Sequence, residues 1–295
     1  MEVKYLSVSE WFQGFCGNIR ISNTDVSNIQ NRYKQITKRI NLDYWNSDSE
    51  TQNSLYVGSY GRGTDIHTRD IDINVQLPYQ TYKKYSDYVG NGQSALLQEV
   101  KNVLQKTYST SHLKGDGQIV GLNFTDGICF EIVPAFTNTD GSFTYADTHN
   151  GGSWKTTNPK KEIKAMNEMN TSTNKNLKRL SRMLRAWKDQ WSVPMSGLLI
   201  DTLAYRFIEK WEYKDKSYLY YDYMTRDFFK YLSGFNNTSY CHAPGSNDLV
   251  YIGGNYSKKA NSCYDIAIEA MSKEKDYPYT AKSKWREIYG SKFPA

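Results

Sequence analysis

The sequence has few cysteines for its length. Its 295 residues include 4 cysteines, and no two of them form a Cys-x-x-Cys pair. Scattered cysteines are typical of reduced thiols, so we expect a cytoplasmic protein. Cys241, His242 and Cys263 are conceivable zinc ligands, but their spacing fits no standard ligand pattern. A zinc site is therefore not expected.

Long apolar runs and export signals are also missing. A membrane-spanning helix needs about 18 or more consecutive apolar residues, and no stretch approaches that length. The first twelve residues, MEVKYLSVSEWF, lack the basic segment and apolar core of a secretory signal. We therefore expect neither a membrane span nor a membrane partner.

Aromatic side chains and basic charge are plentiful. The chain has 25 Tyr and 7 Trp, a content that excludes a disordered chain. Its net charge is +6, and the charge is uneven, because ten basic and two acidic residues lie between Lys155 and Lys188. A basic segment is usually a solvated face, but it is also suited to binding phosphates.

The chain changes character near residue 158, where Asn158-Pro159 begins a helical pattern. Before it, the patterns alternate between strand and helix; after it, they are helical. We predict strands at 55–57, 70–75, 119–124 and 128–133, and helices at 24–42, 96–104, 198–211, 224–232, 264–271 and 281–289. A further helix is striped by Leu177, Leu180, Leu184, Trp187 and Trp191. The fold class is thus α+β, and the length of the chain allows one large domain or two lobes.

Acidic residues gather on the predicted strands. Along residues 70–75, Asp70, Asp72 and Asn74 share one face, opposite the apolar side chains. Two carboxylates so spaced can converge on a pair of divalent cations. Glu131, on the strand at 128–133, would meet the same cations from a neighbouring antiparallel strand. A solvated acidic face is the alternative.

A glycine and a serine precede these acids by about ten residues. Gly58 and Ser59 lie in the stretch Gly58-Ser59-Tyr60-Gly61-Arg62-Gly63-Thr64, between a predicted strand and helix. Glycine lets the backbone approach a phosphate closely, and the serine hydroxyl and nearby amides can donate to it. With the acid trio, this order favours a catalytic metal site over a solvated face.

This arrangement resembles the signature of the nucleotidyltransferase superfamily that includes DNA polymerase β. Within it, the chain is similar to the bacterial cyclic-oligonucleotide synthases, the CD-NTases, relatives of oligoadenylate synthase and cyclic GMP-AMP synthase. The stretches Glu131-Ile132-Val133-Pro134-Ala135 and Trp285-Arg286-Glu287-Ile288-Tyr289-Gly290 support the resemblance, which runs over nearly the whole chain. It implies a polymerase β-like nucleotidyltransferase lobe with a mixed sheet (1–160), a long N-terminal spine helix, and a helical C-terminal lobe completing the nucleotide pocket (161–295).

The resemblance also implies roles for individual residues. Gly58 and Ser59 would hold the donor triphosphate, and Asp70, Asp72 and Glu131 would bind Mg²⁺, with Mn²⁺ as an alternative. Lys188 best matches the family's triphosphate lysine, and Ser196 matches a phosphate-contacting serine at the start of the next helix. The third acid is often Asp in the family and is Glu131 here, one methylene longer.

The implied function is synthesis of a cyclic di- or trinucleotide from nucleoside triphosphates, ATP or GTP, in bacterial anti-phage (CBASS) signalling. The product would act on a downstream cyclic-nucleotide effector, and the basic charge leaves RNA as a candidate activator. Two alternatives stay open at this point. One is a nucleotidyltransferase that modifies RNA ends or a protein, and the other is a catalytically inactive nucleic-acid sensor.

Overall fold

The computed structural model describes residues 7–109, 111–235, 240–254 and 256–295, which fall into two units. The sheet unit comprises residues 21–63 and 67–163. The helical unit comprises the chain up to Arg20, residues 64–66, and residues 164–295. The predicted α+β class is confirmed, with the strands of the main sheet in the first unit and the second mainly helical.

The sheet unit is built on one mixed sheet. Its strands follow the order β1-β2-β5-β4-β3, and β6 pairs with both β5 and β7. β2 and β5 are parallel, whereas the other pairs are antiparallel. The strands are β1 (Ser54–Tyr56), β2 (Ile71–Gln76), β3 (His112–Asp116), β4 (Ile119–Asn123), β5 (Cys129–Thr137), β6 (Phe143–Asp147) and β7 (Ser153–Thr157).

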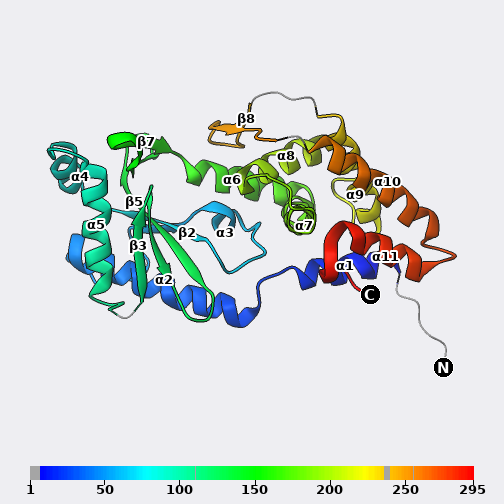
Figure 1. Ribbon diagram of the computed structural model, residues 1–295, viewed down its shortest axis with the longest axis horizontal. Coiled ribbons are helices and arrows are strands. Elements are labelled where there is room, and N and C mark those ends of the chain that lie inside the picture. Colours follow the sequence, from blue (N-terminus) through cyan, green and yellow to red (C-terminus); the bar gives the residue numbers. More distant parts are fainter. Residues whose placement is uncertain (1–6, 110, 236–239, 255) are drawn as a thin grey trace. The chain divides into compact units, whose positions relative to one another are not determined.

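Helices α2 and α5 supply much of the apolar core of this unit. In α2 (Asn23–Tyr44), Ser22 caps the N-terminus, and Ile29, Ile36 and Ile40 are buried on one stripe. This stripe joins Leu96 and Val100 of α5 and the apolar face of β2 in one cluster. Figure 1 shows both helices beside the sheet. The remaining helices of the unit are α3 (Gly58–Arg62), α4 (Tyr79–Ser86), α5 (Gly92–Gln105) and the 3₁₀ turn η1 (His149–Gly151).

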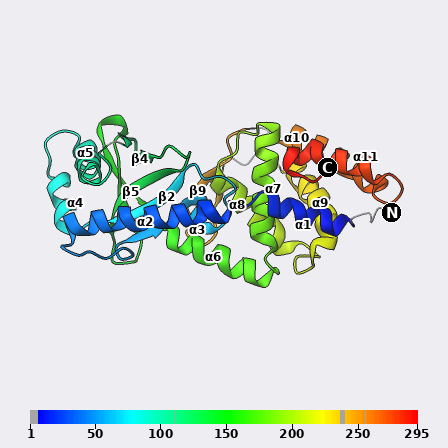
Figure 2. The same ribbon diagram turned by 90° about the horizontal axis from the view of Figure 1, so that it is seen from below.

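The helical unit is held together by a second core rich in aromatic side chains. Trp187, Trp285 and Phe293 are fully buried there, and Figure 2 shows the helices that carry this core. Burial of such large side chains is a main source of folding free energy. The elements are α1 (Val8–Asn18), α6 (Pro159–Ser172, which begins in the sheet unit), α7 (Asn176–Trp191), α8 (Gly197–Lys210), η2 (Tyr218–Tyr220), α9 (Tyr221–Ser233), β8 (Tyr240–His242), β9 (Leu249–Tyr251), α10 (Ser257–Lys273), α11 (Pro278–Tyr289) and η3 (Gly290–Lys292).

Helix α1 lies outside the predicted elements. Ser7 and Glu10 form a capping box at its N-terminus, and Trp11, Phe12 and Phe15 are buried in the core of the helical unit. The division of the chain therefore differs from the predicted one. The first twenty residues belong with the C-terminal helices because their aromatic side chains pack there, and the later boundary falls at 163/164. Among the described residues, no helix is long and apolar enough to cross a membrane.

Candidate active site

Asp72 and Glu131 lie side by side on neighbouring strands of the sheet unit. β2 pairs with β5 in a register that sets Asp72 directly opposite Glu131. The expectation of an antiparallel neighbour is wrong: β5 runs parallel to β2. A parallel pair needs a long crossover, and residues 77–128 between the two strands provide it. The structure thus brings two of the predicted carboxylates together.

The pKa values of both carboxyl groups are raised in this partly buried site. The pKa of Asp72 is raised, first by burial and then by the charge of Glu131, while Arg62 opposes the shift. The pKa of Glu131 is also raised, by burial and then by Asp70. Crowded carboxylates with raised pKa values are typical of sites that hold a cation or move a proton.

The turn at Gly58 packs directly on Asp72. Gly58 has a φ of +57°, and a Cβ built on it would lie 1.8 Å from Asp72 Oδ2. The Val57 amide donates a hydrogen bond of 2.9 Å to the Asp72 carbonyl oxygen, which fixes the turn against β2. Ser59 follows in the first turn of α3 and is half-buried. Gly58 and Asp72 therefore pack against each other, and Ser59 is the next residue along the chain.

Asp70 differs from its predicted place on the strand. β2 begins at Ile71, and Asp70 precedes it with a φ of +61°, in the left-handed region, with an exposed side chain. Its charge contributes to the raised pKa of both Asp72 and Glu131, so it lies near them. Among the described residues, however, no three acidic, His or Cys side chains are gathered closely enough to form a metal site. The three-ligand site stays a prediction.

Two observations nevertheless fit a hard divalent cation at Asp72 and Glu131. The donor set is all oxygen, which is what Mg²⁺ prefers. Asn74, two residues along β2 from Asp72, is 2% exposed, and its Oδ1 has no hydrogen-bond partner among the described residues. Residues two apart on a strand face the same way, so this oxygen adds to the polar face that carries Asp72. The residues present fit Mg²⁺.

Arg62 is a residue of this unit that the sequence reasoning did not single out. Its side chain is buried and forms an ion pair with Glu162 of α6 at 3.1 Å. Its charge also lowers the pKa of Asp72, against the effect of burial. Its position four residues after Gly58, in the stretch Gly58-Ser59-Tyr60-Gly61-Arg62, could have indicated that it lies near the predicted site. Tyr60, in the same stretch, packs its ring on Tyr56 at 4.8 Å between centroids.

The other two predicted site residues belong to the helical unit. Ser196 is the N-cap of α8, and its hydroxyl accepts a hydrogen bond of 3.2 Å from the Leu199 amide. It therefore opens a helix, as expected, and its proposed phosphate contact stays a prediction. Lys188 is half-buried near the end of α7.

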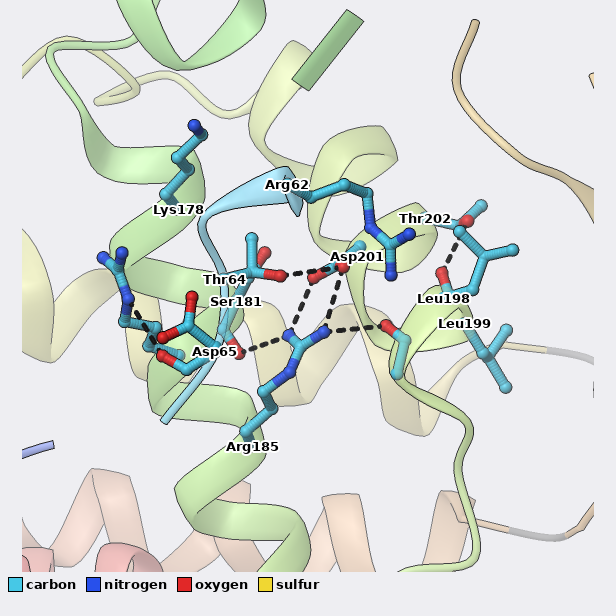
Figure 3. Close-up of polar contacts among 12 residues, drawn as sticks. Arg62, Thr64, Asp65, Lys178, Ser181, Arg185, Leu198, Leu199, Asp201 and Thr202 are labelled. Atoms are coloured by element: carbon cyan, nitrogen blue, oxygen red, sulfur yellow. Dashed lines mark hydrogen bonds and ion pairs between the residues drawn. The ribbon is translucent and has the colours of Figure 1, made fainter. Parts of the chain in front are cut away.

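The basic residues of helix α7 have different roles, which the count of charges between Lys155 and Lys188 does not reveal. Arg185 forms a buried, two-pronged ion pair with Asp201 at 2.7 and 2.9 Å and donates to the Gly197 carbonyl at 3.1 Å (Figure 3). Thr64 also donates to Asp201, at 2.9 Å. Lys178, on the same helix, donates to Asn167, and its pKa is lowered by burial and by Arg182. Part of the basic charge thus stabilises the helical unit itself.

Comparison with known proteins gives matches over most of the chain. The family model of the Second Messenger Oligonucleotide or Dinucleotide Synthetase (SMODS) domain matches residues 6–170. A probable cyclic nucleotide synthase of Bacillus cereus (strain VD146) is 24% identical over 281 residues, which covers 81% of each chain.

Two solved structures show the same fold at low identity. CdnC of E. coli MS115-1, solved in complex with HORMA-deltaN, has a TM-score of 0.69 at 15% identity, over 97% of this chain and 98% of that one. The di-nucleotide cyclase DncV of Vibrio cholerae has a TM-score of 0.67 at 11% identity, over 98% and 87%.

Proposed function

This chain belongs to the SMODS family of second-messenger synthetases, the CD-NTases, and we propose that it makes a cyclic di- or trinucleotide from ATP or GTP with Mg²⁺. The chain is a nucleotidyltransferase of the cyclic-oligonucleotide synthase type. The observation that carries the proposal is the register of Asp72 with Glu131 beneath the Gly58 turn. This arrangement supports the proposal because it places two carboxylates beside the turn expected to hold the triphosphate.

The sheet unit would hold the reacting groups. Oxygen atoms of Asp72 and Glu131, with Asp70 beside them, would hold Mg²⁺. When bound, the ion supplies positive charge that activates the acceptor hydroxyl and neutralises the departing pyrophosphate. The Gly58 turn and the Ser59 hydroxyl would bind the donor triphosphate next to these carboxylates.

The helical unit would supply cations and donors to the triphosphate. Lys188 and Ser196 are the proposed contacts, and Lys178 is a second candidate because its ammonium is bonded to a neutral amide oxygen of Asn167. Transfer of this kind depends mainly on positioning and charge neutralisation, so these contacts would act by orienting the α-phosphate.

The wider role we propose is anti-phage (CBASS) signalling in the cytoplasm, through a downstream effector that senses the product. Relatives of the same fold were solved with nucleotides: CdnC of E. coli MS115-1 with ATP and CdnG of Bradyrhizobium diazoefficiens with GTP. Activation by RNA is part of the proposal, and it rests on the basic charge of the chain.

The decisive experiment identifies the product. The purified chain is incubated with all four nucleoside triphosphates and Mg²⁺, with and without structured RNA, and the phosphatase-treated mixture is analysed by mass spectrometry. A phosphatase-resistant cyclic oligonucleotide is expected, and it is expected to disappear with a metal chelator and in the Asp70→Asn, Asp72→Asn double variant. Linear products on RNA ends would overturn the proposal, as would full turnover by the double variant.

A further inference from the structure

A second basic site lies wholly within the helical unit. A cavity of about 260 Å³ is lined by Arg20, which follows α1, by Arg179 and Arg182 of α7, and by Tyr218 of η2. Gln13 and Cys16 of α1 complete much of its wall, and none of the described residues that line it is acidic. Three guanidinium groups thus share one small cavity.

Two of these arginines are held in place by neighbouring groups. Arg179 donates to the Asn174 carbonyl at 3.2 Å and to the Tyr221 hydroxyl at 3.4 Å, and it stacks 4.6 Å from the centre of the Tyr218 ring. These partners are neutral, so they do not neutralise the charge of Arg179. Arg182 donates from Nε to the Asp65 carbonyl at 3.2 Å. Both side chains are therefore oriented before any ligand arrives.

Asp65 does not line the cavity but lies close enough to Arg20 and Arg182 to interact with their charges. Burial raises the pKa of Asp65, although Arg182, Arg185 and Arg20 oppose that shift. Three of the described lining residues are arginines and none is acidic, so the lining of the cavity is positively charged. Like charges held close together repel unless an anion joins them.

Arg20 is the arginine that is left for a ligand. Its side chain is exposed and makes no hydrogen bond or ion pair with any described residue. An exposed guanidinium at the mouth of a cavity can add two parallel N–H donors to an oxyanion without first breaking another contact. Removing it is also expected to leave the folded state intact, since the side chain is exposed and makes no hydrogen bond or ion pair with any described residue.

We propose that this cavity binds a small phosphate-class oxyanion, such as inorganic pyrophosphate or the terminal phosphate of a nucleotide. Its volume lies below the roughly 300–1,000 Å³ of pockets for drug-sized ligands, which favours a small anion. A nucleic-acid strand would require cations that follow its backbone along a groove, whereas these converge on one cavity. None of Asp70, Asp72, Glu131, Lys188 and Ser196 lines the cavity, so this site is additional to the proposed catalytic residues.

Binding is tested by titration calorimetry on the full chain with inorganic pyrophosphate, in a metal chelator so that no divalent ion is present. The wild type is expected to bind one equivalent, and Arg20→Ala to weaken binding about tenfold or more, because a charge-assisted contact is lost. Arg20→Lys, which keeps the charge but loses the paired donors, should fall between the two.

Lys210→Ala is the matched control, since Lys210 is an exposed cation of the same unit that does not line the cavity. It should bind pyrophosphate as the wild type does, and so should the Asp70→Asn, Asp72→Asn double variant. Parallel titrations with AMP and with a cyclic dinucleotide identify which phosphate source is preferred.

Three results would overturn the proposal: no pyrophosphate binding at millimolar concentration, equal affinity in Arg20→Ala and wild type, or binding of structured RNA alone. None of these measurements needs turnover, so the outcome is independent of the product experiment.

Discussion

The carboxylate of Asp72 fills the space in which residue 58 has no side chain. A Cβ at Gly58 would lie 1.8 Å from Asp72 Oδ2 and 2.5 Å from its Cγ. The glycine is therefore required twice, once by its positive φ and once by the acid beneath it.

Gly58→Ala should abolish product and lower the melting temperature, because the new methyl group must displace Asp72 or the turn. Gly127 is the control: its φ of +86° imposes similar backbone strain, but nothing lies within 4 Å of an added Cβ. Gly127→Ala is expected to cost about 1 kcal/mol through strain alone and to keep turnover. Equal loss of activity in both variants would contradict the role assigned to the contact with Asp72.

Asp72→Asn should stabilise the metal-free protein while removing activity. One of two neighbouring carboxylates then loses its charge, so the repulsion with Glu131 is relieved. In thermal unfolding at pH 8 with a chelator, the variant is expected to melt above the wild type. Mg²⁺ should raise the melting temperature of the wild type and leave that of the variant unchanged. Asp48→Asn, at an exposed position, should match the wild type in every arm.

Substitutions at Ser196 separate its two assigned roles. Ser196→Ala loses the cap on Leu199 and should cost about 1 kcal/mol of stability. Ser196→Asp keeps a good N-cap but brings a negative charge to the position proposed to contact the triphosphate. We expect Ser196→Asp to melt like the wild type and to lose most of its turnover, measured as pyrophosphate release. Wild-type turnover in Ser196→Asp would leave the residue a helix cap only.

Asp201→Asn should be among the most damaging single changes in the helical unit. Asp201 is fully buried and accepts from Arg185 and Thr64, so the variant leaves a buried guanidinium without its counter-charge. Breaking a buried pair in this way costs about 3–5 kcal/mol. Glu168→Gln, which alters an exposed pair with Lys164 at 3.8 Å, should change stability by less than about 0.5 kcal/mol. Urea denaturation compares the two.

Stability should fall as the pH rises from about 5 to 8. Burial raises the pKa of Glu274 to about 7, with Asp222 adding to the shift, and burial raises the pKa of Asp222 to about 6. In that window the folded chain binds more protons than the unfolded chain, so deprotonation favours unfolding. Glu274→Gln, which can still accept from Trp285, should melt progressively higher than the wild type as the pH increases. A constant difference in melting temperature across the range would contradict the assignment.

Local patterns in the sequence predict most elements well. Apolar spacing over residues 24–42 predicts the helix that the structure places at Asn23–Tyr44, and Asn158-Pro159 marks the start of α6. The turn at 125–127 joins β4 and β5 as predicted, with the Phe124 amide donating to the Ile128 carbonyl at 3.0 Å. These features depend on residues that are close in sequence, so the local sequence pattern predicts them.

Features set by distant contacts are not predicted. The parallel pairing of β2 with β5 depends on a crossover of some fifty residues, and alternation within a strand carries no information about its neighbour's direction. The left-handed φ of Asp70 breaks an alternation that looks complete in the sequence. Charge counting also cannot tell that Arg185 is buried against Asp201 while Arg20 is exposed, because the burial of each arginine depends on how the helices pack.

The short segment 64–66 limits how the protein can be divided into fragments. It belongs to the helical unit, although the residues on either side of it, Gly63 and His67, belong to the sheet unit. Truncation at the 163/164 boundary would therefore remove Asp201, the hydrogen-bond partner of Thr64, and would separate α1 from the core into which it packs. A contiguous fragment of residues 21–163 contains the sheet unit complete, whereas only the whole chain contains the helical unit complete.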